Sequence, residues 1–315
     1  MTSPGKRKRD KKRTERILTP GGRLERHAHG DEFLLDAFTT DDLVRWESHG
    51  KTTLEFEIRR FHELEALRQI NKRALVEALR AVPPVQLKLK RCGRIIDHRY
   101  SDNPLSSRGS LLSGGRFNIG NDCDNTSVER FSALYLAENH NTAMLERFGG
   151  STQLKHMDAT EHALFTEPSS YTYVRIGGKL ERVFDLTDKA VLKGFADIIA
   201  DFSLPEELLE LGKKVGLNPP GVVRSARVLL ATLMAQDWRY LPTQYGLPAN
   251  SQIFASLLRE AGFEAIRYRS VRGGRNCIAV FPDMLSGASE VHLTDAAPPT
   301  ASVTVLNSET WEKLI

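Results

Sequence analysis

The residues best suited to chemistry gather in one stretch of the chain, residues 113–148. Arg116 follows two glycines, where a ligand can approach the bare backbone closely, and its planar guanidinium suits phosphate. Tyr135 lies in a short apolar run that favours a strand, and Glu146 lies on a helix predicted to follow it. An arginine, a tyrosine and a carboxylate are therefore expected on three successive elements, a loop, a strand and a helix.

A second group of polar residues lies far downstream. Gln252 is on a predicted helix, and Ser270 precedes a loop with two glycines that leads to Asn276, at the start of a predicted strand. Hydroxyl and amide groups form hydrogen bonds that orient a ligand.

Each of these residues also has a plainer interpretation. Arg116 is equally compatible with a surface ion pair, and Glu146 with a solvated helix position. Tyrosine in an apolar strand is most often a core aromatic, which is the plain interpretation of Tyr135. Ser270 is compatible with a turn before two glycines.

The order of the motifs gives a more specific signal than any one of them. GGRFN, followed by ALYLAENHNTAMLE, resembles the first half of the RES domain, which is the toxin half of a bacterial toxin–antitoxin pair. NSQIFASLLREAGFEAIRYRSVRGGRNCIAVF resembles its second half. The family is named for an arginine, a glutamate and a serine, and the matching positions are Arg116 (or Arg99), Glu146 and Ser270. The resemblance covers residues 86–285.

The resemblance implies an α+β fold, an ADP-ribosyltransferase-like mixed β-sheet core with inserted helices and an N-terminal helical extension. It implies that NAD is the substrate and that the bond between nicotinamide and ribose is broken, by a glycohydrolase using water or by a phosphorylase using inorganic phosphate. The alternative is a mono-ADP-ribosyltransferase that modifies a macromolecule. No further cofactor and no metal are expected.

The resemblance also suggests a role for each residue. Arg116 would hold phosphate, with Arg272 and Arg275 as further candidates for this role. Tyr135 would contact the nicotinamide or ribose, and Glu146 would oppose the positive charge that develops on the ribose. Ser270 and Asn276 would orient the nicotinamide-ribose part, with Gln252 assisting from its helix.

The charge of the chain is concentrated at its start. Residues 1–30 contain ten lysines and arginines against three acidic residues, whereas the whole chain has a net charge of +4. We predict a disordered basic arm there, with nucleic acid as a weakly suggested partner.

Three further segments follow the arm. Residues 31–85 predict an N-terminal helical region, with a capping box at Thr52 and an apolar stripe that favours packing on the body or in a homodimer. Pro83-Pro84 marks its end. Residues 86–285 predict the NAD-binding catalytic domain, and residues 286–315 a tail with a terminal helix.

Within residues 86–285, YTYVRI and ERVFDL predict two strands joined by a glycine-containing hairpin, and helices are predicted at 188–201, 204–214 and 222–236. This helical segment between the two motif halves is long for the family. We expect insertions of this kind at the edge of the site, where they affect access and partner recognition. The implied partner is a small antitoxin with a DNA-binding domain.

Composition narrows the class of protein. The chain has 315 residues, is 40% hydrophobic and has three cysteines without close spacing, so neither a disulfide framework nor a thiolate metal site is indicated. No apolar run reaches membrane-spanning length and no secretory signal is visible, which favours a cytoplasmic protein. Neither a GxGxxG nor a Walker pattern is present.

Overall fold

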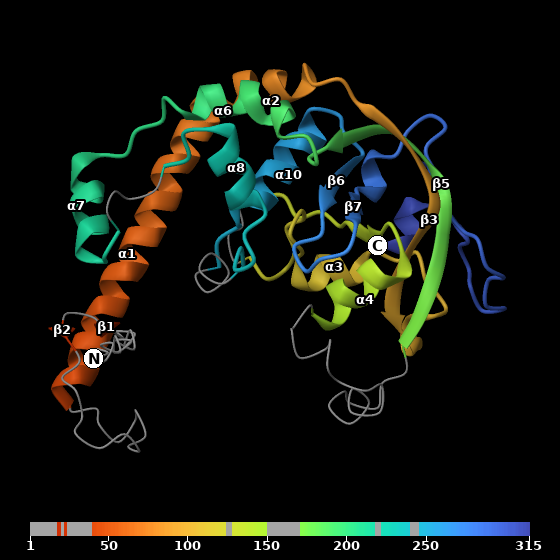
Figure 1. The fold of residues 1–315 in the computed structure, drawn as a ribbon, viewed down its shortest axis with the longest axis horizontal. Coiled ribbons are helices and arrows are strands. Elements are labelled where there is room, and N and C mark those ends of the chain that lie inside the picture. The colour runs from red at the N-terminus through yellow and green to blue at the C-terminus, as the bar shows by residue number, and fades with distance from the viewer. Residues whose placement is uncertain are drawn as a thin grey trace, which may run out of the picture. The chain divides into compact units, whose positions relative to one another are not determined.

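The β-sheet joins strands that lie far apart in the sequence (Figure 1). This computed structural model describes residues 18–19, 22–23, 40–123, 128–149, 171–217, 222–239 and 246–315. The strands are β1 (Leu18–Thr19), β2 (Gly22–Arg23), β3 (Val85–Asp97), β4 (Leu134–Ala137), β5 (Tyr171–Asp185), β6 (Ala265–Arg269), β7 (Asn276–Val280), β8 (Glu290–Leu293) and β9 (Val305–Leu306).

The large sheet has the order β3-β4-β7-β6-β5-β8-β9, and β3 also pairs with β5. Five strands therefore form a closed circuit of pairings, in the order β3, β4, β7, β6 and β5. Within the described sheet, β5 and β6 run parallel, and the other pairs are antiparallel. The predicted α+β fold with a mixed sheet is confirmed.

The helices are α1 (Thr40–Ile70), α2 (Lys72–Arg80), α3 (Arg108–Ser113), α4 (His140–Phe148), α6 (Lys193–Ile199), α7 (Glu206–Lys214), α8 (Ala226–Leu233) and α10 (Asn250–Glu260). Short 3-10 turns occur at η2 (His98–Tyr100), η4 (Lys189–Leu192), η5 (Pro282–Met284) and η6 (Trp311–Leu314).

The contacts divide the chain into two compact units. One contains the described residues up to Arg60 together with those from Leu204 to 217, so it includes α7 and the first part of α1. The other contains 61–203 and the described residues from Val222 to Ile315. Every residue that the sequence predicted for the site belongs to this second unit.

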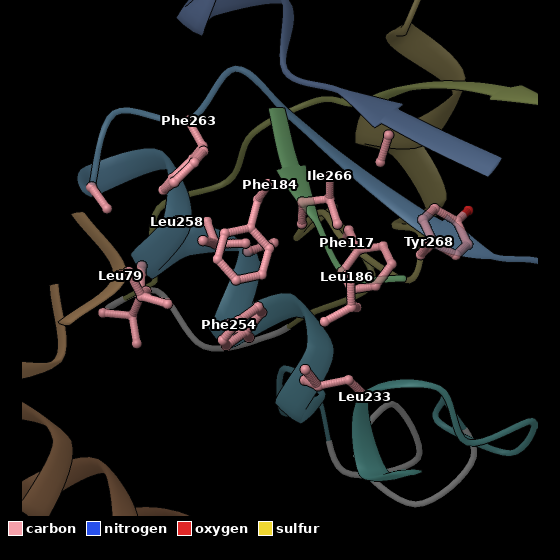
Figure 2. Close-up of a cluster of buried hydrophobic side chains, with 14 of the residues drawn as sticks. Leu79, Phe117, Phe184, Leu186, Leu233, Phe254, Leu258, Phe263, Ile266 and Tyr268 are labelled. Atoms are coloured by element: carbon pink, nitrogen blue, oxygen red, sulfur yellow. The ribbon is translucent and has the colours of Figure 1, made fainter. Parts of the chain in front are cut away.

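Two apolar cores lie on opposite faces of the sheet in the second unit. One is formed by side chains from the closed circuit of strands, such as Leu134, Ile176 and Ile278. The other is formed between the sheet and the helices, and Figure 2 shows its aromatic centre. There Phe184 of β5 contacts Phe254 of α10 with ring centroids 5.8 Å apart. Because successive side chains of a strand point to opposite faces, β4, β5, β6 and β7 contribute to both cores.

The predicted hairpin at Gly177-Gly178 is wrong, because β5 runs through it as one strand of fifteen residues. These glycines pair with His292 and Val291 of β8. Gly178 has a φ of +142°, and a Cβ there would collide with the carbonyl oxygen of Glu290. The missing side chains allow close approach of a neighbouring strand, so they do not mark a turn.

The helical predictions hold in outline, with different ends. The predicted capping box at Thr52 is wrong, because Thr52 lies inside α1 and its hydroxyl donates to the Ser48 carbonyl at 2.9 Å. The N-terminal helix is interrupted at Asn71, after which α2 begins. The predicted helix at 188–201 is divided into η4 and α6, and that at 222–236 is α8.

The segment 286–315 joins the sheet. β8 pairs with β5, and β9 pairs with β8. The predicted terminal helix is a 3-10 turn, η6, whose Leu314 carbonyl accepts the backbone N–H of Ser107 at 3.0 Å. Most of the basic arm lies outside the described residues. Among the residues that are described, no helix is long and apolar enough to cross a membrane.

Candidate active site

The loop that carries Arg116 is closed by a tight backbone turn. α3 ends just before Gly114, which has a φ of +61°. The backbone groups of Gly115 and Asn118 then pair with each other, with N to O distances of 3.2 and 3.3 Å. A Cβ at Gly115 would lie 2.6 Å from Asn118 Oδ1 and would collide with the Tyr135 hydroxyl. This position therefore requires glycine because the neighbouring side chains fill the space that a side chain would take.

Two of the predicted site residues hold this loop in place. The Tyr135 hydroxyl donates to Asn118 Oδ1 and accepts the N–H of Phe117, both at 2.9 Å. Gln252, fully buried on α10, donates its amide to the carbonyls of Gly115 and Asn118 at 3.1 and 2.9 Å. The Tyr135 hydroxyl and the Gln252 NH2 group thus bond the loop, while the Gln252 amide oxygen accepts the N–H of Ala249 at 2.8 Å. Burial also raises the pKa of Tyr135, which keeps its hydroxyl protonated.

Arg116 is buried, with 8% of its surface exposed. Its Nη1 donates to the carbonyls of Leu233 and Ala235, at 2.9 and 2.8 Å, where α8 ends. The guanidinium also lies 5.6 Å from the ring centroid of Trp238. A cation at the C-terminal end of a helix is favourable because the last carbonyls have no partners within the helix. Arg116 therefore joins the loop to the segment that follows α8.

Glu146 and Ser270 meet although 124 positions separate them. Glu146 is on α4, whose N-cap residue Asn139 accepts the N–H of Thr142 with its side chain at 2.8 Å. The Ser270 hydroxyl donates to Glu146 Oε1 at 2.6 Å. The thiol of Cys277 donates to the same oxygen at 3.7 Å. One carboxylate oxygen thus has two donors, and such bonds to a charged group are among the stronger ones.

The β6–β7 loop is docked on α4, which fixes this pair. The N–H of Ser270 donates to the Arg275 carbonyl at 3.1 Å, so the loop is closed at its base. The N–H of Arg275 donates to Thr142 Oγ1 at 2.8 Å. Gly274, with a φ of +86°, lies against this threonine, and a Cβ there would be 2.6 Å from Thr142 Oγ1. The first turn of α4 therefore positions the loop, and its second turn carries the carboxylate.

Burial shifts the pKa of three side chains around the Glu146–Ser270 pair. Burial lowers the pKa of Arg116, and the charge of Glu146 opposes that shift. Burial, with Glu146 adding to the effect, raises the pKa of the Cys277 thiol. Burial likewise raises the pKa of Tyr268, whose ring contacts that of Phe117 with centroids 4.9 Å apart. The thiol and this phenol therefore stay neutral beside Glu146.

Arg272 is the exposed cation beside the pair. Its Nε lies 4.0 Å from Glu146 Oε2, and half of its side chain is exposed. Its backbone N–H donates to Ser270 Oγ at 3.2 Å. A Cβ at Gly149, just after α4, would be 3.0 Å from Arg272 Nη1. The glycine thus leaves room for the guanidinium at the end of the helix.

Asn276 does not join Glu146 and Ser270. Its amide donates to Glu138 Oε2 at 3.0 Å, and Glu138 in turn forms an ion pair with Arg267 at 2.8 Å. Cys277, the next residue of β7, faces Glu146. Because side chains alternate along a strand, Asn276 points to the other face of the sheet.

Arg99 also lies apart from the pair. Its side chain is 73% exposed and its one ion-pair partner among the described residues is Asp97, at 3.3 Å. The guanidinium stacks over Tyr100, with its carbon 4.8 Å from the ring centroid. A surface position of this kind gives no contact with Glu146 or Ser270.

The sequence predictions omitted Tyr268 and Cys277. A signal for both was present in the strand period of two. Tyr268 precedes Ser270 by two residues, which places both on one face of the sheet, and Cys277 is offset by one residue from Asn276. No group of three or more metal-binding side chains occurs within the described part of the chain.

The comparison with sequence families agrees with these motifs. The sequence model of the family described as RES domain matches residues 91–300, which is more than half of the chain. No curated protein matches. Among solved structures, the crystal structure of the M. tuberculosis MbcT–MbcA toxin-antitoxin complex contains a similar chain, 15% identical, with 76% of this chain and 96% of that chain covered and a TM-score of 0.38. The family match extends through β8, the strand that pairs with β5. This chain belongs to the RES domain family.

Proposed function

We propose that this chain is an enzyme that breaks the bond between nicotinamide and ribose in NAD. The single observation that carries the proposal is the contact between Ser270 Oγ and Glu146 Oε1 at 2.6 Å. It brings the glutamate and serine of the family name together from the two halves of the chain. An oriented carboxylate in partly buried surroundings is suited to stabilise a cation.

The chemistry follows from the charge that develops during cleavage. When the bond between C1′ of the ribose and the pyridinium nitrogen breaks, its electron pair goes to the nitrogen and nicotinamide leaves as a neutral molecule. The ribose carbon becomes an oxocarbenium-like cation. Glu146 opposes this charge, and Ser270 holds the carboxylate in one orientation. Tyr135 and Gln252 support the reaction through the loop that carries Arg116.

The molecule that accepts the ribosyl group decides whether the enzyme is a glycohydrolase, a phosphorylase or a transferase. Attack by water, which then loses a proton, gives ADP-ribose. Attack by inorganic phosphate gives the 1″-phosphate of ADP-ribose. Attack by a nucleophile on a macromolecule gives mono-ADP-ribosylation. The three reactions share the departure of nicotinamide, and the ADP-ribosyltransferase-like fold implied by the resemblance is compatible with each of them.

The biological role proposed for this activity is that of a toxin that depletes the NAD of the cell. The solved structure reported above is of a toxin in complex with an antitoxin. A cognate antitoxin protein is therefore part of the proposal for this chain.

The test is to incubate the purified full chain with NAD, with and without inorganic phosphate, and to identify the products by chromatography and mass spectrometry. We expect release of nicotinamide in at least one condition, and the second product identifies the acceptor. A third incubation contains radiolabelled NAD and a cell extract. Label that appears on a macromolecule there would assign the transferase reaction. NAD that remains intact under all three conditions would refute the proposal.

A further inference from the structure

The two oxygens of Glu146 have different surroundings. Oε1 accepts both the Ser270 hydroxyl, at 2.6 Å, and the Cys277 thiol, at 3.7 Å. Among the described residues, the charged neighbour of Oε2 is Arg272, whose Nε is 4.0 Å away. Since Oε1 is already occupied by two donors, Oε2 is the oxygen that can face a substrate. Arg272 lies next to it.

The contact of Arg272 with Oε2 is weak by its geometry. A distance of 4.0 Å is at the outer limit of an ion pair, and half of the Arg272 side chain is exposed to solvent. Exposed pairs of this kind contribute little, because water screens them and the long side chain loses freedom. The guanidinium thus has donors that can turn to an anion without the loss of a strong bond.

Arg116 is in the opposite situation. Its surface is 8% exposed, and its Nη1 already donates to the carbonyls of Leu233 and Ala235. Taking these bonds away would leave one buried and one partly buried carbonyl group unpaired, which is costly. Of Arg116 and Arg272, Arg272 is the one whose guanidinium is available.

The backbone of the loop adds a second reason. Gly273 and Gly274 follow Arg272 directly and have φ values of +102° and +86°. A Cβ at Gly274 would lie against Thr142 of α4, so the missing side chain lets the loop that carries Arg272 lie close to this helix. The N–H of Arg272 donates to Ser270, so the residue is tied to the catalytic pair.

We propose that Arg272 binds the pyrophosphate of the dinucleotide, and that Arg116 instead fixes the loop and the segment after α8. When the guanidinium pairs with phosphate, Oε2 of Glu146 becomes free to face the ribose. This inference rests on the proposed function, since it identifies how that site holds its substrate.

The matched control is Arg269→Gln. Arg269 is exposed like Arg272 and ends the strand that leads into the same loop. It is the residue before Ser270, so its side chain points to the other face of the sheet. Both variants remove one positive charge at almost the same place in the chain.

The kinetic test compares NAD with nicotinamide riboside, which has the same scissile bond and no phosphate. For Arg272→Gln we expect the KM for NAD to rise at least about tenfold, with kcat changed less than about threefold. The KM for nicotinamide riboside should stay as in the wild type, and Arg269→Gln should alter neither. An unchanged KM for NAD, or an equal rise for both substrates, would overturn the inference.

A binding measurement separates this inference from the proposed function. Isothermal titration with ADP-ribose tests pyrophosphate binding without any reaction. Weaker binding in Arg272→Gln than in Arg269→Gln, by about tenfold, is expected. If the wild type binds ADP-ribose in this way but releases no nicotinamide, the proposed activity is wrong and the phosphate site stands. If Arg272→Gln binds as tightly as the control, or the wild type does not bind, the phosphate site is wrong.

Discussion

Replacing Glu146 by glutamine removes the charge that the proposed mechanism requires and keeps the shape of the side chain. The amide oxygen of glutamine can take the position of Oε1 and accept the Ser270 hydroxyl and the Cys277 thiol. The amide nitrogen then replaces Oε2, whose nearest charged neighbour is 4.0 Å away. We therefore expect the free energy of unfolding to change by about 1 kcal/mol or less.

The magnitude of the catalytic loss follows from the surroundings of the carboxylate. Two unit charges about 4 Å apart interact by about 4 kcal/mol at an effective dielectric constant of about 20. Since 31% of the Glu146 side chain is exposed, solvent reduces this value. Removal of one electrostatic contact from an active site costs at least about 2.7 kcal/mol in the transition state. This cost corresponds to a loss of about a hundredfold in kcat. We expect a loss between a hundredfold and about a thousandfold.

The assay is release of nicotinamide from NAD at saturating concentration, with Glu309→Gln as the control. Glu309 is an exposed carboxylate near the C-terminus and should be neutral in activity. Thermal unfolding of each variant shows whether the fold is kept. A folded Glu146→Gln protein that keeps more than about a tenth of the wild-type kcat would refute the assignment of Glu146 as the stabilising anion.

Three further changes test how the loop and the sheet are held. Gly115→Ala should lower the free energy of unfolding by about 1–3 kcal/mol, because its Cβ would collide with neighbouring side chains. The control is Gly109→Ala, where a Cβ meets nothing within 4 Å and the free energy of unfolding should not fall. Equal urea midpoints for the two variants would contradict this prediction. Gln252→Leu should lower the free energy of unfolding, measured in urea, by about 2–4 kcal/mol, since it leaves the carbonyls of Gly115 and Asn118 unpaired. A loss under about 1 kcal/mol would show that water replaces the amide. Burial raises the pKa of Cys92 from 9.0 to about 11, so the folded chain keeps a proton that the unfolded chain releases. Stability should therefore fall as the pH rises from about 9 to about 11, and melting curves of Cys92→Ala should lack that part of the decline.

The sequence predicted the class of fold, the family and the elements that carry Glu146 and Ser270. The prediction of a hairpin was wrong because a pair of glycines is compatible both with a turn and with the interior of a strand that another strand approaches closely. Gly177-Gly178 satisfies the composition of a turn, yet the chain continues straight because β8 approaches the backbone there. Only the pairing partner distinguishes these cases, and that partner lies more than a hundred residues away.

The site shows the same limit. The meeting of Glu146 with Ser270 is a contact over 124 positions, which the family resemblance implied but local patterns do not encode. Side chains alternate along β7, so Asn276 and Cys277 point to opposite faces of the sheet. Cys277 contacts Glu146, and Asn276 therefore points away from the Glu146–Ser270 pair. The engagement of Arg116 with the end of α8 depends on an inserted helix, so it was not predictable from the GGRFN motif itself.

The measurement that tests the central claim most directly is a double-mutant cycle on nicotinamide release from NAD, with Glu146→Gln, Ser270→Ala and the double variant. If Ser270 acts through Glu146, the loss in kcat for the double variant equals that for Glu146→Gln alone, within about a factor of three. Losses that multiply would show that the two side chains act independently, and a wild-type chain that releases no nicotinamide would contradict the account as a whole.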